Sequence, residues 1–173
     1  MLKQFEDIFE ASKDAIGYAA LDGAILLINR AFIELTGFSR EELLRMNARD
    51  LIPEQHKEQR DRVVAQVLQT GEPAEYEIDY LQKNGSQVPV SITVFAVKGD
   101  DGKPTGLAAI VRDLTERKRA EEQFRLVVES SPNGMLMVDE SGTILLVNRQ
   151  IEQLFGYGRA ELIGQPVEML VPQ

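Results

Sequence analysis

The chain repeats itself over a long period. Residues 5–53 align without a gap with residues 124–172, and Gly142 follows Gly23 by 119 residues (142 − 23). The clearest match sets LDGAILLINR at 21–30 against ESGTILLVNR at 140–149. Solenoid repeats are much shorter, roughly 20–50 residues, so each copy is expected to be a domain with its own core. The sequence predicts one complete domain followed by the N-terminal half of another.

Composition excludes several classes of function. The sequence has no cysteine, which excludes disulfides, thiolate metal sites, cysteine nucleophiles and flavin–cysteine adducts. A net charge of −9 argues against a general nucleic-acid surface, which needs a basic stripe. No apolar run approaches the ~18 residues of a membrane helix. We therefore expect a globular, cytoplasmic protein region.

The first copy predicts an α+β domain. Apolar residues at helical spacing indicate a helix over 2–11, and Asp22-Gly23 turns a β-hairpin. A capping box at Ser39 to Glu42 starts a short helix, and Pro53 opens the longest one. Three further strands form a meander over residues 75–80, 87–98 and 105–113. The expected fold is a five-stranded antiparallel sheet with short helices on one face.

A helix is expected to connect the two copies. Residues 115–129 contain no glycine or proline, Asp113 or Thr115 can cap the start, and Pro132 follows the end. A thin apolar seam is formed by Leu114, Ala120, Phe124 and Val127. An uninterrupted helix transmits a displacement between domains, which a Gly/Ser linker does not.

The motifs in this order resemble those of tandem PAS sensor domains. The resemblance covers the whole chain, the first domain fully and the second over its N-terminal half. It implies domains at 1–114 and 131–173, joined by a signalling helix at 115–130. The matching segments are Asp22-Gly23, Ile28-Asn-Arg-Ala-Phe32, Leu35-Thr-Gly-Phe-Ser-Arg-Glu-Glu-Leu43, Leu51-Ile-Pro-Glu54, Thr70-Gly-Glu72, Asn84-Gly85 and Val111-Arg-Asp-Leu-Thr-Glu-Arg-Lys118.

The resemblance also implies a role. PAS domains act as sensors or dimerisation modules in bacterial signal-transduction proteins, and their outputs are usually histidine kinases of two-component systems, diguanylate cyclases or chemoreceptors. The last matching segment is similar to the one that ends a PAS domain and begins its signalling helix. Asp113, Leu114 and Thr115 are therefore the expected residues of signal transmission.

Two cofactor branches of the family can be compared position by position. In the blue-light branch the adduct-forming cysteine lies in a Gly-Arg-Asn-Cys-Arg segment, and here Ala48 takes its place, which excludes a cysteinyl-flavin adduct. In the haem branch a histidine on the long helix binds iron. Alignment puts Arg60 at that position and the lone histidine, His56, one helical turn earlier. A lone histidine near a helix start is more often exposed, so haem is not expected.

Noncovalent flavin (FAD or FMN) stays open. Asn29 and Asn47 could offer amides to its polar edge, and Phe32 or Tyr18 could offer a ring. The alternative for Asn29 is a helix cap, and its recurrence as Asn148 favours that structural role.

Core-facing side chains would line the pocket, or would simply fill the core. Tyr80 and Thr93 are the polar candidates, and a buried hydroxyl needs a partner that a ligand or the backbone could supply. The candidate lining, on periodicity and family position, is Ile28, Asn29, Phe32, Leu35, Met46, Asn47, Ile52, Val64, Tyr80, Thr93, Phe95 and Ile110.

No catalytic motif is present. The sequence has no Gly-rich phosphate loop, nucleophile elbow or His-Glu-x-x-His pair, and its carboxylates fall on predicted turns and exposed faces. No metal site is expected. Two hypotheses remain: a sensor of a small ligand or redox state that shifts the connecting helix, or a ligand-free dimerisation and relay spacer.

A homodimer is expected under both hypotheses, because it would bury the apolar face of residues 2–9 and the seam of the connecting helix. The second copy supplies only two strands, which alone are marginal in water. If it is ordered, a partner chain or the first domain is expected to supply the missing surface.

Overall fold

The computed structural model describes residues 2–171, and it divides into two compact units, residues 1–116 and 117–173. Pro172, the last residue of the repeat, and Gln173 lie outside the described part. Within it, no helix is both long and apolar enough to cross a membrane.

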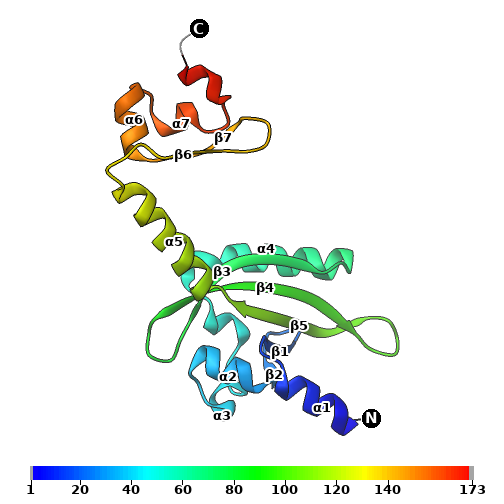
Figure 1. Cartoon of the computed structure of the whole chain (residues 1–173). Helices are drawn as coiled ribbons and strands as arrows, with labels where there is room; N and C mark the ends of the chain where they lie inside the picture. The colour runs from blue at the N-terminus through cyan, green and yellow to red at the C-terminus, as the bar shows by residue number, and fades with distance from the viewer. Residues whose placement is uncertain (1, 172–173) are drawn as a thin grey trace. The chain divides into compact units, whose positions relative to one another are not determined.

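The first unit is a five-stranded antiparallel sheet with helices packed on one face (Figure 1). The strands pair in the order β2-β1-β5-β4-β3, so that the first hairpin joins the meander through β1 and β5. The expected α+β fold is confirmed. Its elements are α1 (Leu2–Ala11), β1 (Ala15–Ala20), β2 (Ile25–Ile28), α2 (Arg30–Thr36), α3 (Arg40–Leu43), the 3₁₀ helix η1 (Ala48–Leu51), α4 (Glu54–Thr70), β3 (Ala74–Leu81), β4 (Gln87–Lys98) and β5 (Pro104–Asp113).

Local sequence signals set the helix ends. Ser39 and Glu42 form the expected capping box at the start of α3, and Gly37 ends α2 in the left-handed region at φ 74°. Pro53 precedes α4, and Gly71 ends it at φ 76°. These positive φ angles favour glycine because it has no Cβ.

The core of the first unit lies between the sheet and the helices. Alternate residues of β4, among them Val90, Ile92 and Val94, are buried on the same face. Val67 of α4 is fully buried against this face, and Phe32 of α2 is 5% exposed. The strand period of two puts every second residue toward the helices.

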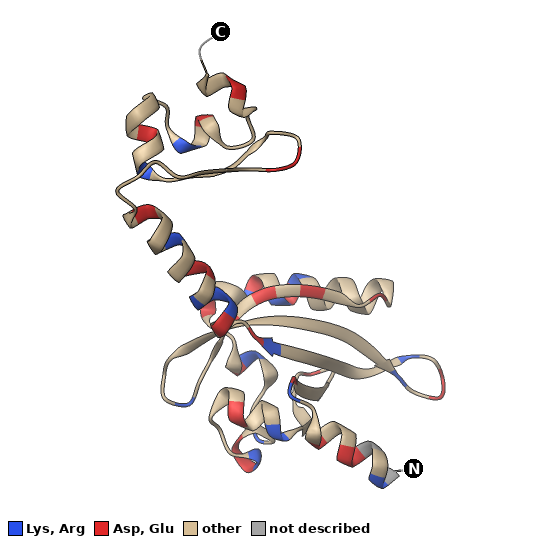
Figure 2. Cartoon of the chain, viewed as in Figure 1, with Lys and Arg blue, Asp and Glu red and all other residues tan. Residues whose placement is uncertain are grey.

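The second unit begins with most of α5 (Thr115–Ser130), one unbroken helix over the expected range. Charged residues of both signs alternate along α5 (Figure 2), and Arg125 pairs with Glu122 at 2.6 Å between Nη2 and Oε1. The other elements are β6 (Leu136–Val138), β7 (Ile144–Val147), α6 (Arg149–Phe155), α7 (Arg159–Leu162) and η2 (Val167–Leu170).

The second unit has only a small core, formed by Ile144, Val147, Ile151 and Leu162. Val128, near the end of α5, is 2% exposed and its carbonyl accepts a hydrogen bond from Asn148. Leu154 of α6 remains 72% exposed. The end of α5 therefore supplies part of the surface that the two strands lack.

Candidate functional site

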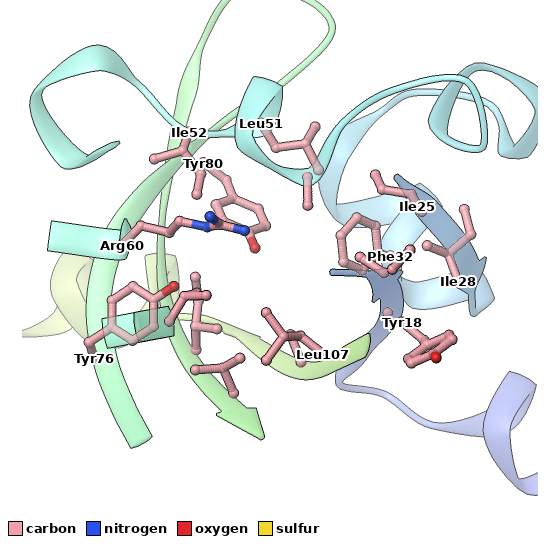
Figure 3. Close-up of a pocket in the computed structure, with 18 residues that line it drawn as sticks. Tyr18, Ile25, Ile28, Phe32, Leu51, Ile52, Arg60, Tyr76, Tyr80 and Leu107 are labelled. Carbon is pink, nitrogen blue, oxygen red and sulfur yellow. The ribbon is translucent and has the colours of Figure 1, made fainter. Parts of the chain in front are cut away.

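A mainly apolar cavity of about 60 Å³ lies between the sheet, η1 and α4 of the first unit (Figure 3). Strands β1, β4 and β5 form one wall, and β3 contributes two tyrosines. Its lining is Gly17, Tyr18, Ala19, Ala20, Ile25, Ile28, Phe32, Ala48, Leu51, Ile52, Arg60, Val64, Tyr76, Tyr80, Ile92, Val94, Leu107 and Ala109.

Three polar side chains from two elements meet at one end of this cavity. Arg60 extends from α4 toward Tyr80 of β3, and Tyr76 lies four residues before Tyr80 on the same face of that strand (Figure 3). Arg60 is the one charged residue among the described residues that line the cavity. Its side chain is only 17% exposed although α4 is a surface helix.

The two tyrosines are neutral at physiological pH. Burial raises the pKa of Tyr76 to about 12, and burial also raises the pKa of Tyr80. The rings of Tyr80 and Phe32 lie 6.4 Å apart between centroids and are tilted by 57°. Across the described part of the chain, no protein group is hydrogen-bonded to Oη of Tyr80, although the residue is 6% exposed.

Arg60 also borders a hollow outside the cavity. Arg60 and Val64 line both spaces, so they form part of the wall between the cavity and the outer hollow. Nη1 of Arg60 lies 3.1 Å from Oδ1 of Asp61, whose Oδ2 lies 2.8 Å from Nη2 of Arg49. One carboxylate is thus shared by two guanidinium groups, which leaves a net charge of about +1 in this triad.

Several of the expected pocket residues line the cavity. Phe32 and Tyr80 do so, as do Ile28, Ile52 and Val64. Leu35 and Met46 pack against the core but lie outside the cavity lining.

The expectation for Thr93, Phe95 and Ile110 is wrong by one position in register. Ile92 and Val94 of β4 line the cavity. Thr93 and Phe95 alternate with them along the strand and therefore face the other side of the sheet. Ile110 pairs with Thr93, and therefore shares that far side. Because the strand period is two, a shift of one residue exchanges the faces.

The two asparagines have structural roles instead of facing the cavity. Asn29 is fully buried. Its Oδ1 accepts hydrogen bonds from the amides of Ile16 at 2.9 Å and Phe32 at 3.1 Å, and its Nδ2 donates to the carbonyls of Phe9 and Asp14. All four side-chain hydrogen-bonding positions of Asn29 are thereby used.

Asn47 caps η1 and joins it to the first hairpin. Its Oδ1 accepts from the amide of Arg49, and its Nδ2 donates to the carbonyl of Asp22 at 2.8 Å. Neither asparagine lines the cavity.

The residues present do not fit flavin or haem. The expected amides are engaged with the backbone, and a cavity of about 60 Å³ has room for about four to six non-hydrogen atoms, far fewer than either ring system contains. His56 lies outside the cavity lining, with Nε2 at 3.2 Å from Oδ2 of Asp79. The haem-ligand position is occupied by Arg60, which cannot bind iron as a neutral nitrogen ligand. Within the described residues, no cluster of three acidic or histidine side chains could hold a metal ion.

The expected transmission residues connect β5 with α5. Oδ1 of Asp113 accepts a hydrogen bond from the amide of Thr115 at 2.7 Å. Leu114 is 4% exposed, and its amide donates to the carbonyl of Pro89 at 2.9 Å. Two other residues of β5, Leu107 and Ala109, line the cavity.

Arg60 and Tyr76 were missed by the sequence analysis as pocket residues. Tyr76 alternates with Glu75 and Glu77 in phase with Tyr80, and this pattern could have identified it. Arg60 lies in a highly charged helix, where sequence alone favours a solvent-exposed arginine. Its orientation depends on the packing of α4 against the sheet.

Comparisons with known proteins agree with this architecture. A sensor histidine kinase, TmoS of Ectopseudomonas mendocina, is 30% identical over 82% of this chain and 14% of its own length. A probable diguanylate cyclase, DgcE of Escherichia coli, is 27% identical over 81% of this chain and 12% of its own length. This chain therefore spans a small part of each relative.

A crystal structure of a PAS domain from Colwellia psychrerythraea has 26% identity and a TM-score of 0.64, and the match covers 67% of this chain and 98% of that chain. The family description "PAS domain" matches residues 13–116, more than half of the sequence. The description "PAS fold" matches residues 122–173. The chain belongs to the PAS domain family, with one PAS match in each of its two units.

Proposed function

We propose that this PAS sensor region binds a small molecule in the cavity of its first unit and passes the change to α5. The observation that carries this proposal is the continuity of β5. Leu107 and Ala109 of this strand line the cavity, and Asp113 at its end accepts a hydrogen bond from the amide of Thr115, the first residue of α5. A ligand that displaces β5 would therefore alter the start of the helix.

Further contacts support this route. Val111 lies between the cavity residues of β5 and Asp113, and is 1% exposed in the core. Arg112 pairs with Asp14 at 3.0 Å between Nη2 and Oδ2, which ties the end of β5 to the start of β1. Packed elements shift as units because the interior has little free volume. Residues 1–114 would then be the sensor domain and 115–130 the signalling helix, with 131–173 as the N-terminal half of a second PAS domain.

The parent protein is proposed to carry an output domain outside this chain. The relatives are named as a sensor histidine kinase and a probable diguanylate cyclase, and either output would suit the relay. The chain itself is proposed to be noncatalytic. A small ligand suits the cavity better than a redox-active flavin, because the cavity is small and the candidate amides are engaged.

A homodimer through α1 and α5 belongs to the same proposal. Ile8 of α1 is 72% exposed, and Phe124 and Val127 of α5 are 56% and 66% exposed. Residues 124 and 127 lie on the same helix face. A second copy of the chain would remove this apolar surface from water.

The ligand-free spacer is the second candidate function, and the small volume of the cavity favours it. A screen of metabolites for thermal stabilisation of the whole chain, followed by hydrogen exchange, distinguishes the two. The sensor predicts a compound that raises the melting temperature and changes amide exchange at 113–118. A stabilising compound that leaves exchange at 113–118 unchanged would contradict the relay. The absence of any stabilising compound would favour the spacer.

A further inference from the structure

The cavity has a mostly apolar wall and a cationic end. Arg60 is its one charged lining residue among those described, and the remaining walls are mainly aliphatic or aromatic. A charged side chain in such a site requires a partner. A small pocket with one fixed cation selects a ligand with one anionic group and an apolar remainder.

The local charges do not fully neutralise Arg60. Arg60 forms an ion pair with Asp61, and that carboxylate also pairs with Arg49. A guanidinium group has five N–H donors, and one of them contacts Asp61. The planar group can therefore still bind a carboxylate through two parallel hydrogen bonds.

Tyr80 offers a neutral donor close to this cation. Its hydroxyl belongs to a side chain that is more than nine-tenths buried, lines the cavity and has no hydrogen-bond partner in the described structure. Oη of Tyr80 is not one of the fully buried unpartnered atoms of the described residues, so it faces open space in the cavity and is free to donate there. Arg60 approaches the ring of Tyr80 (Figure 3), so one anionic group could contact both residues.

The volume limits the ligand. A water molecule needs about 10–15 Å³ on a comparable measure, so a cavity of about 60 Å³ holds about four to six non-hydrogen atoms. Propionate and butyrate are of this size. Both combine a carboxylate with a short apolar chain.

We propose that the cavity binds a short-chain monocarboxylate, with Arg60 holding the carboxylate, Tyr80 donating to it and the aliphatic walls covering its chain. This inference rests on the proposed sensor function and names the ligand class of the same site. Access would be through the outer hollow, where Arg60 and Val64 border both spaces.

Calorimetric titration of the whole chain with butyrate, butyramide and butylammonium tests the inference. Butyrate is expected to bind, and the neutral and cationic analogues are expected to bind at least about tenfold more weakly, since a hydrogen bond to a charged group is lost. Arg60→Met should weaken butyrate binding by about tenfold or more, and Tyr80→Phe by about threefold or more. Arg62→Met, at an exposed position of the same helix, should not change it.

Circular dichroism and thermal melting establish that each variant is folded, and Arg60→Lys retains the charge if Arg60→Met is unstable. Arg60→Lys should bind butyrate more tightly than Arg60→Met. Equal binding of butyrate and butyramide, unchanged binding in Arg60→Met, or no binding of propionate and butyrate to the wild-type chain would overturn the monocarboxylate assignment. The sensor proposal would survive these results if another metabolite stabilised the chain and changed exchange at 113–118.

Discussion

Asn148 makes in the second unit the same set of hydrogen bonds that Asn29 makes in the first. Asn29 joins the carbonyl of Phe9 in α1 to the start of α2, and Asn148 joins the carbonyl of Val128 in α5 to the start of α6. The end of α5 therefore has the structural role in the second unit that α1 has in the first.

A glutamate next to each of these carbonyls strengthens the correspondence. Glu10 accepts from the amide of Arg30 at 2.8 Å and from Nη2 of Arg40 at 2.9 Å. Glu129 accepts from the amide of Arg149 at 3.2 Å and also pairs with Arg159. The connecting helix is thus bound to the second unit by contacts at the start of α6 and α7, which suits the proposed relay.

Replacing Asn29 with alanine should destabilise the first unit strongly. The change removes a helix cap and leaves the partly buried carbonyl of Phe9 without its partner. We expect a loss of about 2–4 kcal/mol in the free energy of unfolding, measured by urea denaturation. Gln69→Ala, at an exposed position of α4, is the control. A loss for Asn29→Ala no larger than that of the control would contradict the structural role.

Gly23 should tolerate alanine much less than Gly85 does. Both have positive φ, 89° and 85°. A Cβ at Gly23 would clash with Oδ1 and Nδ2 of Asn47, whereas nothing lies within 4 Å of a Cβ at Gly85. Gly85→Ala should cost about 1–2 kcal/mol from backbone strain, and Gly23→Ala about 1–3 kcal/mol more from overpacking. Equal losses in thermal or urea unfolding would argue against the close approach of Asn47.

Stability should depend on pH through Glu42. Hydrogen bonds from Lys83, and then from the Ser39 amide, lower the pKa of Glu42 below its ordinary value. Its contribution to stability is therefore present above the ordinary pKa and is lost as the pH falls through the lowered folded pKa. Glu42→Gln should lower the melting temperature near about pH 7 and have progressively less effect below about pH 4. Glu41→Gln, on the exposed side of α3, is the control. If the difference in melting temperature between the wild-type chain and Glu42→Gln did not change with pH, this role of Glu42 would be contradicted.

The proposed dimer should depend on the exposed apolar face of α5. Phe124→Ser combined with Val127→Ser removes two exposed apolar side chains and should shift the chain from dimer toward monomer in sedimentation equilibrium at about 10–50 µM, the range of weak interfaces. Arg119→Ser, also exposed on α5, should leave the distribution unchanged. If the wild-type chain were monomeric at these concentrations, the proposed homodimer would be contradicted.

Most of the fold could be predicted from the sequence because its signals are local. Gly37 and Gly71 mark helix ends, Ser39 and Glu42 mark a helix start, and the Asp22-Gly23 turn marks the first hairpin. Each depends on the conformation of a few neighbouring residues, which the sequence specifies directly. The long repeat also indicated that the segment before Asn148 should resemble α1, although the sequence analysis treated it as a linker.

The cavity was harder to predict because it depends on register and packing. Strand β4 has apolar residues on both faces, such as Val94 on one and Phe95 on the other, so alternation alone does not identify the cavity face. The sequence around Arg60 does not indicate that its side chain points toward the cavity. Its place in the lining follows from the position of α4 over β3, which is set by tertiary contacts.

Amide hydrogen exchange at the start of α5 tests the central claim most directly. Ala109→Leu adds volume on the cavity face of β5, and Ala108→Leu adds the same volume on the opposite face. The relay predicts that Ala109→Leu changes exchange at residues 114–118 while Ala108→Leu leaves it close to the wild-type rate. Identical exchange at 114–118 in the wild-type chain and the Ala109→Leu variant would contradict the claim that the cavity controls the helix.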